Sequence, residues 1–109
     1  IKEHTMQSTN PTFKSFKAFY PYYLKEHRNV ICRRLHFIGS ALVLAVIAIA
    51  LLKQHYSLLW LLPVIGYGFA WVGHFFFEKN RPATFKHPFY SLWGDWVMFK
   101  DMLVGKIKF

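Results

Sequence analysis

An uncharged run decides the fold of this chain: it reads FIGSALVLAVIAIALL and extends over sixteen residues, from Phe37 to Leu52. As an α-helix, such a run rises about 24 Å, slightly less than the hydrocarbon thickness of a bilayer. Continuing the helix back to Arg33 supplies the missing turn, because the long side chains of Arg33 and Arg34 can extend to the headgroups. The sequence therefore predicts a membrane-spanning helix over about 33–52.

A second uncharged run extends from Tyr56 to Phe77, and as a helix it would rise about 33 Å. Its proline and glycines are common in membrane helices, where small residues allow neighbouring helices to approach closely. Only three residues, Lys53 to His55, separate the two runs, so the two helices should be antiparallel neighbours. The predicted fold is a single all-α membrane domain over 1–109, built on a transmembrane hairpin with spans at about 33–52 and 56–77.

The composition supports a membrane protein and argues against other classes. The chain has 109 residues, of which 54% are hydrophobic and 20% aromatic, and a soluble domain of this size could not bury so many large side chains. The net charge of +9 raises the possibility of nucleic-acid binding. The basic residues flank the apolar runs instead of forming one stripe, which favours membrane lipids as partners and no nucleic acid. The single cysteine, Cys32, excludes an intrachain disulfide and multi-cysteine metal sites.

The distribution of basic residues predicts the orientation. Of the fourteen Lys and Arg residues, only Lys53 lies between the two runs, and all others precede or follow the hairpin or lie at its first residues. Because cytoplasmic segments carry an excess of Lys and Arg, both termini are expected in the cytoplasm.

Two further helices are expected beside the hairpin, over about 13–26 and 89–104. Aromatic and aliphatic residues recur there at helical spacing, which is typical of amphipathic helices at the membrane surface. Pro21 should kink or divide the first of them. The alternative is that either flank spans the bilayer beside a partner, and a homodimer would bury more of the aromatic surface.

The candidate functional residues are histidines, and their positions in the sequence indicate which of them can come together. His36 lies near the start of the first span and His74 near the end of the second, so an antiparallel hairpin brings them to the same membrane face. His27 precedes His36 by nine residues, a spacing that points the two rings apart on one continuous helix. A break near Asn29 would let them converge. His87 follows a loop that can fold back beneath the hairpin.

Four histidines and a nearby carboxylate, Glu78, could hold a redox metal, since imidazole suits iron, zinc, copper and nickel. The alternative is that these histidines only hydrogen-bond headgroups or helix ends. His55 belongs to the far turn and His4 to a polar tail, so neither is a ligand candidate. Arg81, with its planar guanidinium, could hold a substrate carboxylate beside the metal. Such a site, open to the bilayer, suits an amphiphile with an acid head and an acyl tail.

Three segments carry a family resemblance: FYPYYLKEHRNVICRRLHFIGS (19–40), GYGFAWVGHFFFEKNRPATFKHP (66–88) and YSLWGDWVMFKDML (90–103). Together they resemble the small multi-pass proteins related to the fungal endoplasmic-reticulum 2-hydroxy fatty acid dioxygenase. The resemblance covers nearly all of the chain after residue 12. The chain resembles the short bacterial members of this family, and this resemblance implies a location in the bacterial inner membrane.

The resemblance implies an iron(II)-dependent dioxygenase of fatty acid α-oxidation, which converts a 2-hydroxy fatty acid and dioxygen to the fatty acid one carbon shorter. By motif, the family's histidines correspond to His27, His36 and His74, with His87 as a fourth and looser match. Glu78 would then orient a ligand imidazole or accept a proton, and Arg81 would neutralise the substrate carboxylate.

Two other functions remain open from the sequence. The chain could be a non-catalytic membrane protein that binds lipid or serves in assembly, or another metal-dependent lipid enzyme such as a zinc hydrolase. The metal content of the purified protein distinguishes these readings, because only the dioxygenase requires iron.

Overall fold

The computed structural model describes residues 13–109, so His4 and the polar stretch around it lie outside the described residues. Every regular element in the described part of the chain is helical. In order these are α2 (Phe16–Lys25), α3 (Val30–Leu52), the 3-10 helix η1 (Tyr56–Trp60), α4 (Leu61–Val72), the π-helix η2 (Gly73–Glu78), the short 3-10 helix η3 (Ala83–Phe85) and α5 (Pro88–Leu103).

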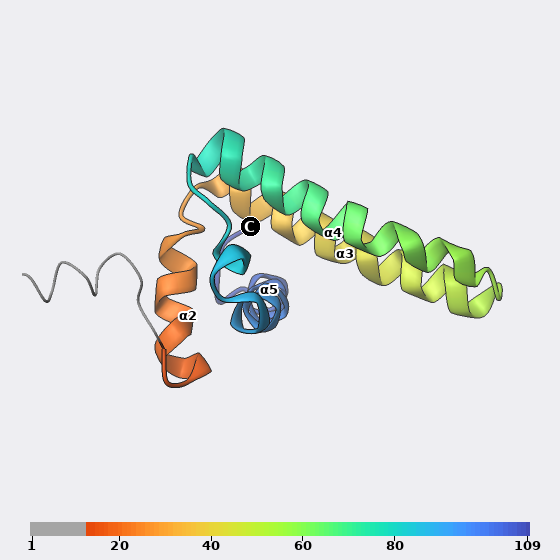
Figure 1. Ribbon diagram of the computed structural model, residues 1–109, viewed down its shortest axis with the longest axis horizontal. Coiled ribbons are helices and arrows are strands. Elements are labelled where there is room, and N and C mark those ends of the chain that lie inside the picture. The colour runs from red at the N-terminus through yellow and green to blue at the C-terminus, as the bar shows by residue number, and fades with distance from the viewer. Residues whose placement is uncertain (1–12) are drawn as a thin grey trace, which may run out of the picture.

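The long helix α3 packs along α4, and the chain reverses between them, so the two lie side by side and antiparallel (Figure 1). Small residues permit the close approach: a Cβ atom on Gly39 would lie only 2.9 Å from the Cβ of Phe69. The stretches Val30–Leu52 and Tyr56–Glu78 are each long and apolar enough, by length and composition, to cross a membrane. The turn between them leaves His55 exposed, as expected.

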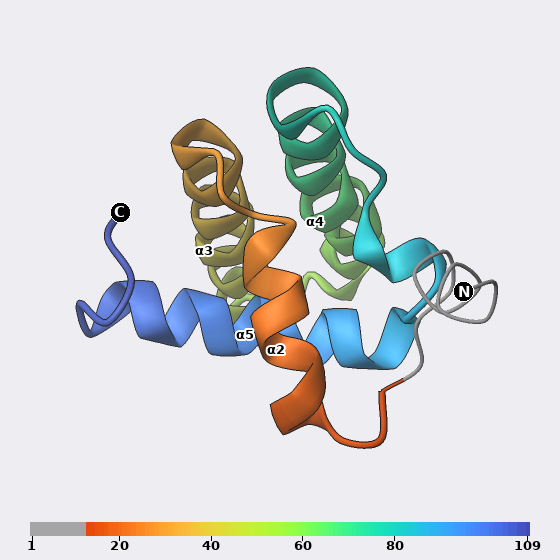
Figure 2. The ribbon, with the colours of Figure 1, turned by 90° about the vertical axis from the view of Figure 1, so that its left-hand side faces the viewer.

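The flanking helices α2 and α5 lie across one end of the α3–α4 pair (Figures 1 and 2). Their bounds are close to the predicted 13–26 and 89–104. Where α2 crosses α5, the two helices enclose the core of the molecule, which consists of Phe19, Tyr23, Ala83, Met98 and Met102.

Pro21 does not divide the first flanking helix, because α2 continues through this residue. The side chain of Ser15 caps the helix by accepting a hydrogen bond from the Ala18 N–H. Pro21 lies on the exposed side, whereas Phe19 and Tyr23 are buried against the rest of the molecule. Tertiary packing therefore outweighs the hydrogen bond that the proline removes.

Candidate metal centre

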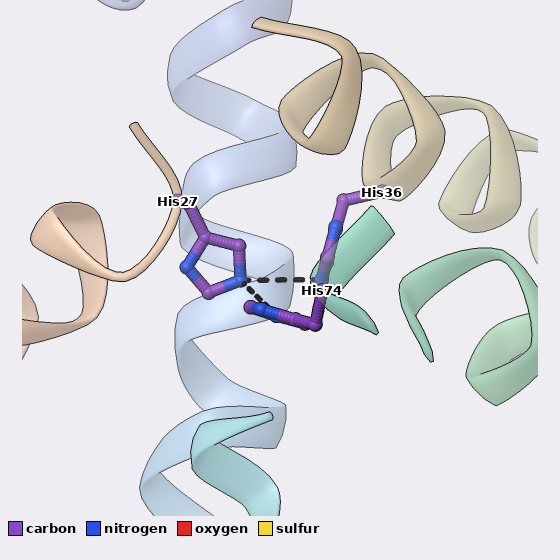
Figure 3. A group of neighbouring side chains, drawn as sticks. All are labelled: His27, His36 and His74. Atoms are coloured by element: carbon purple, nitrogen blue, oxygen red, sulfur yellow. Dashed lines mark hydrogen bonds between the residues drawn. The ribbon is translucent and has the colours of Figure 1, made fainter. Parts of the chain in front are cut away.

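Three histidines from different parts of the chain converge near α5, the pale-blue helix behind them in Figure 3. His27 comes from the turn after α2, His36 from α3 and His74 from η2, and all three are buried. The Nε2 atom of His27 lies 3.2 Å from that of His36 and 3.0 Å from that of His74. One ring nitrogen of each residue lies within 4.8 Å of the other two, which is close enough for a single metal ion.

The turn between α2 and α3 brings His27 to the other two rings. Asn29 begins α3 by accepting hydrogen bonds from the N–H groups of Ile31 and Cys32 through its side-chain oxygen. The guanidinium of Arg33 donates to the carbonyl oxygens of His27 and Arg28, which braces the turn. The chain does break between His27 and α3, as the convergence of the two rings requires, and the break reorients His27 relative to His36.

His74 is positioned by the irregular end of the second long stretch. It lies in η2, and π-helical turns are often found at functional sites because they change the register of the helix. Lys79 then adopts the left-handed conformation, with φ 62°, and the Asn80 N–H donates to the carbonyl of His74. This tight reversal turns the Asn80 side chain back onto the His74 ring.

Each of the three rings is oriented by a hydrogen bond at Nδ1. The partners are the carbonyl oxygen of Tyr23 for His27 at 2.6 Å, the carbonyl oxygen of Cys32 for His36 at 2.9 Å, and Oδ1 of Asn80 for His74 at 2.7 Å. The Asn80 amide is itself oriented, since its nitrogen donates to two oxygens of Glu26. All three partners are acceptors, so the proton of each neutral imidazole is on Nδ1 and the lone pair is on Nε2.

This arrangement suits a shared cation. Three acceptor nitrogens face one another in a buried site, and a metal ion among them would satisfy all three. Two nitrogens that bind one metal at about 2.1 Å lie about 3.0–3.4 Å apart, which agrees with the two short Nε2 separations. Outer hydrogen bonds from Nδ1 to carbonyl or amide oxygens are characteristic of metal-ligating histidines. Burial and the neighbouring His36 and His74 lower the pKa of His27 well below its ordinary value, so this ring stays neutral at physiological pH.

The structure does not bring every predicted site residue to the cluster. His87 precedes α5, and its ring packs against Phe13 and Phe19 instead of joining the other three histidines. Arg81 is exposed and lines a neighbouring pocket together with Glu26, because the reversal at Lys79 directs Asn80 and not Arg81 toward the histidines.

The hydrogen bond that Glu78 makes joins it to the backbone at the start of α3, and its expected part in the chemistry stays a prediction. Its carboxylate accepts a hydrogen bond from the backbone N–H of Asn29, and the Asn29 amide donates to the carbonyl of Phe77. These two bonds join the end of η2 to the start of α3. Glu78 therefore holds together the two segments that carry the histidines, and Asn80 orients the imidazole.

Sequence reasoning missed the polar residues opposite the cluster. The Tyr23 ring stacks on His27 at 4.0 Å between centroids, and its hydroxyl donates to the carboxylate of Asp95 in α5. Burial raises the pKa of Tyr23 well above its usual range and that of Asp95 to about 7. Asp95 and Ser91 are polar, four residues apart and off the apolar stripe of α5, and this spacing was the available signal.

Two adjoining cavities lie beside the histidines. The smaller, with an empty volume of about 280 Å³, is lined by all three histidines together with Ser91 and Asp95. The larger, of about 730 Å³, begins at His36 and Asp95 and continues between the hairpin and α5. Its walls are mainly apolar and include Val43, Leu62, Gly66, Ala70, Leu92 and Trp96. We call this larger cavity the apolar groove.

Comparison with known proteins identifies a family. The family model described as "2-hydroxy-palmitic acid dioxygenase Mpo1-like" matches residues 13–107 of this chain. No curated protein and no solved structure matches the chain. The family match covers all three histidines and both flanking helices, in agreement with the resemblance in the sequence. The chain therefore belongs to the Mpo1-like family.

Proposed function

We propose that this protein is an iron(II)-dependent dioxygenase that converts a 2-hydroxy fatty acid and dioxygen to the fatty acid one carbon shorter. The observation that carries the proposal is the convergence of three buried imidazoles, each with Nδ1 hydrogen-bonded, and with the Nε2 atoms of His36 and His74 at 3.2 and 3.0 Å from that of His27. The family description supports the class of substrate.

His27, His36 and His74 would hold the metal. When bound, iron(II) would supply the redox chemistry that allows dioxygen to react with an organic acid. The protein's own contribution is to orient the three rings through the Tyr23, Cys32 and Asn80 oxygens. Three protein ligands leave room for other groups at the metal, as catalytic metal sites generally require.

The proposed reaction balances without an external reductant. The bond between C1 and C2 of the substrate breaks, C2 becomes the carboxyl carbon of the shorter acid, and C1 leaves as carbon dioxide. The electrons released by the two carbons equal those that one dioxygen molecule accepts, and water is the remaining product. The apolar groove beside His36 has the character that an acyl chain requires.

The membrane arrangement is part of the proposal. The α3–α4 pair would span the bilayer as a hairpin, with α2, α5 and the histidines at the cytoplasmic face of a bacterial inner membrane. The large exposed apolar side chains on this pair support it: Leu44 is 46% exposed and Leu52 is 82% exposed. Such a site would receive its amphiphilic substrate directly from the lipid.

The test is anaerobic loading of the purified protein with iron(II), followed by addition of 2-hydroxypalmitate and dioxygen. We expect oxygen consumption in step with formation of the acid one carbon shorter, loss of both in His74→Ala, and no loss in the control His55→Ala at the far turn. The proposal fails if the wild type binds no iron or if His74→Ala retains full turnover. Zinc in place of iron, with oxygen-independent activity, would instead indicate a hydrolase.

A further inference from the structure

Helix α5 places two polar side chains opposite the histidines. Ser91 and Asp95 are four residues apart, so they project from the same face of the helix. Both line the small cavity that contains the three imidazole rings. Neither residue belongs to the three-histidine cluster, although both line the same cavity.

The Ser91 hydroxyl is unusual because it is buried without a partner. Ser91 is only 3% exposed, and its Oγ makes no hydrogen bond within residues 13–109. Leaving a buried hydroxyl unpaired costs stability, and alanine would fill the position without that cost. A serine at this place is explained if a ligand in the cavity supplies the missing partner.

Asp95 lies where the two cavities meet. It lines both the small cavity and the apolar groove, and the Tyr23 hydroxyl is its hydrogen-bond partner among the described residues. The far wall of the groove consists of apolar residues such as Val43 and Leu62. A molecule whose polar end contacts Asp95 would therefore extend its apolar end along the groove.

We propose that Ser91 and Asp95 form the binding site for the head of a 2-hydroxy fatty acid. The Ser91 hydroxyl donates to the substrate carboxylate, and the Asp95 carboxylate accepts the hydrogen of the 2-hydroxyl group. Tyr23 positions Asp95, and the acyl chain lies in the apolar groove between the hairpin and α5. This proposal rests on the proposed function and gives α5 the recognition role that the sequence suggested for Arg81.

The site predicts how the protein distinguishes a 2-hydroxy acid from the unsubstituted acid. A site built to bind a hydroxyl rejects the analogue without it, because its own polar group is then left unpaired. Wild-type protein should bind 2-hydroxypalmitate more tightly than palmitate. Asp95→Asn preserves the size of the side chain and the contact with Tyr23. It should reduce this preference, mainly by weakening the binding of 2-hydroxypalmitate.

The test measures dissociation constants for 2-hydroxypalmitate and palmitate without oxygen, on iron-loaded protein, alongside iron content and thermal stability. We expect Ser91→Ala to weaken binding of both acids about tenfold, the typical effect of losing one hydrogen bond to a charged group. Its melting temperature should stay the same or rise. The control is Ser57→Ala, since Ser57 is exposed in η1 at the far end.

The outcomes separate this proposal from the proposed function. If Ser91→Ala and Asp95→Asn leave both constants unchanged while iron and turnover are retained, the head-binding site is wrong and the dioxygenase assignment stands. If wild-type protein binds the acids with the expected dependence on Ser91 and Asp95 but consumes no oxygen, the dioxygenase assignment is wrong and the binding site stands.

Discussion

The two ends of the α3–α4 pair are made of similar apolar helices but are stabilised in different ways. At the far end, Leu52 is 82% exposed and Trp60 is 83% exposed, so nothing within residues 13–109 covers them. At the near end, where α2 and α5 lie, His36 and His74 are buried and hydrogen-bonded. In the proposed membrane arrangement the far end is surrounded by lipid, whereas the near end depends on contacts within the chain. Substitutions at the two ends should accordingly have different consequences.

The largest difference should appear in metal binding. Replacing His27, His36 or His74 by alanine should each lower iron affinity by more than about 100-fold, because losing a group that only orients a ligand already costs about 10–100-fold. His55→Ala at the far end and His87→Ala beside α5 should leave the affinity within about twofold, since neither ring joins the cluster. Competition with a calibrated chelator measures this. Equal losses in His87→Ala and His74→Ala would show that the ligand set is wrong.

The second difference concerns the membrane. Leu44 and Val30 are both in α3 and are similarly exposed, at 46% and 43%, but Val30 begins the helix and Leu44 lies near its middle. Leu44→Lys should disfavour insertion by about 3 kcal/mol, whereas Val30→Lys, whose ammonium can extend to the headgroups, should have little effect. The membrane-integrated fraction after expression is the readout. If both variants integrate equally well, the hairpin does not span the bilayer as proposed.

Asn80 tests whether the orientation of a ligand matters as much as its presence. Asn80→Ala removes the acceptor at 2.7 Å from Nδ1 of His74 and leaves the three imidazoles in place. Iron affinity should fall by about 10–100-fold, with the protein still folded. Unchanged affinity in a folded Asn80→Ala protein would mean that the π-helix alone orients His74.

Two glycines of the second long stretch offer a matched pair for packing. A Cβ on Gly73 would lie 3.0 Å from Sγ and 3.1 Å from Cα of Cys32, whereas a Cβ on Gly68 would meet nothing within 4 Å. Gly73→Ala should cost about 1–3 kcal/mol because α3 and η2 must separate slightly. Gly68→Ala should be neutral or stabilise the helix by up to about 1 kcal/mol. Thermal unfolding in detergent compares them, and similar melting temperatures would argue against close contact at Cys32.

The smallest effect is the dependence of stability on pH in metal-free protein. The pKa of His27 is lowered by burial, so as the pH falls below about 6.5 the unfolded chain binds a proton that the folded chain does not. Stability from this residue is present above that pH and decreases by about 1 kcal/mol by about pH 5.5. In His27→Gln, which has no imidazole to protonate, the free energy of unfolding should decrease by about 1 kcal/mol less over the same pH range. If the stabilities of the wild type and of His27→Gln fall equally as the pH is lowered, His27 is not the source of the effect.

The sequence predicted the parts of the structure that follow from periodicity and charge. The uncharged runs gave both long helices, the short segment around His55 gave the reversal, and the antiparallel pairing brought His36 to His74. The break at Asn29 was also foreseen as the condition for His27 to join them. These features depend on neighbours in the chain or on one pairing of helices, which a single sequence can indicate.

Features that depend on irregular backbone or on the path of α5 could not be read from the sequence. The left-handed Lys79 decides that Asn80 and not Arg81 faces the cluster, and no local pattern marks a lysine for that conformation. The position of His87 follows from the packing of its ring against Phe13 and Phe19. Ser91 and Asp95 became candidates only once α5 was placed over the histidines.

X-ray absorption at the iron edge of the loaded wild-type protein examines the three-histidine centre most directly. We predict one iron per chain, nitrogen neighbours at about 2.1 Å and the outer scattering of about three imidazole rings. His74→Ala protein, if it retains any iron, should show one ring fewer, and His55→Ala should give the wild-type spectrum. A wild-type spectrum with only oxygen neighbours and no imidazole scattering would show that the convergence of His27, His36 and His74 does not form a metal site.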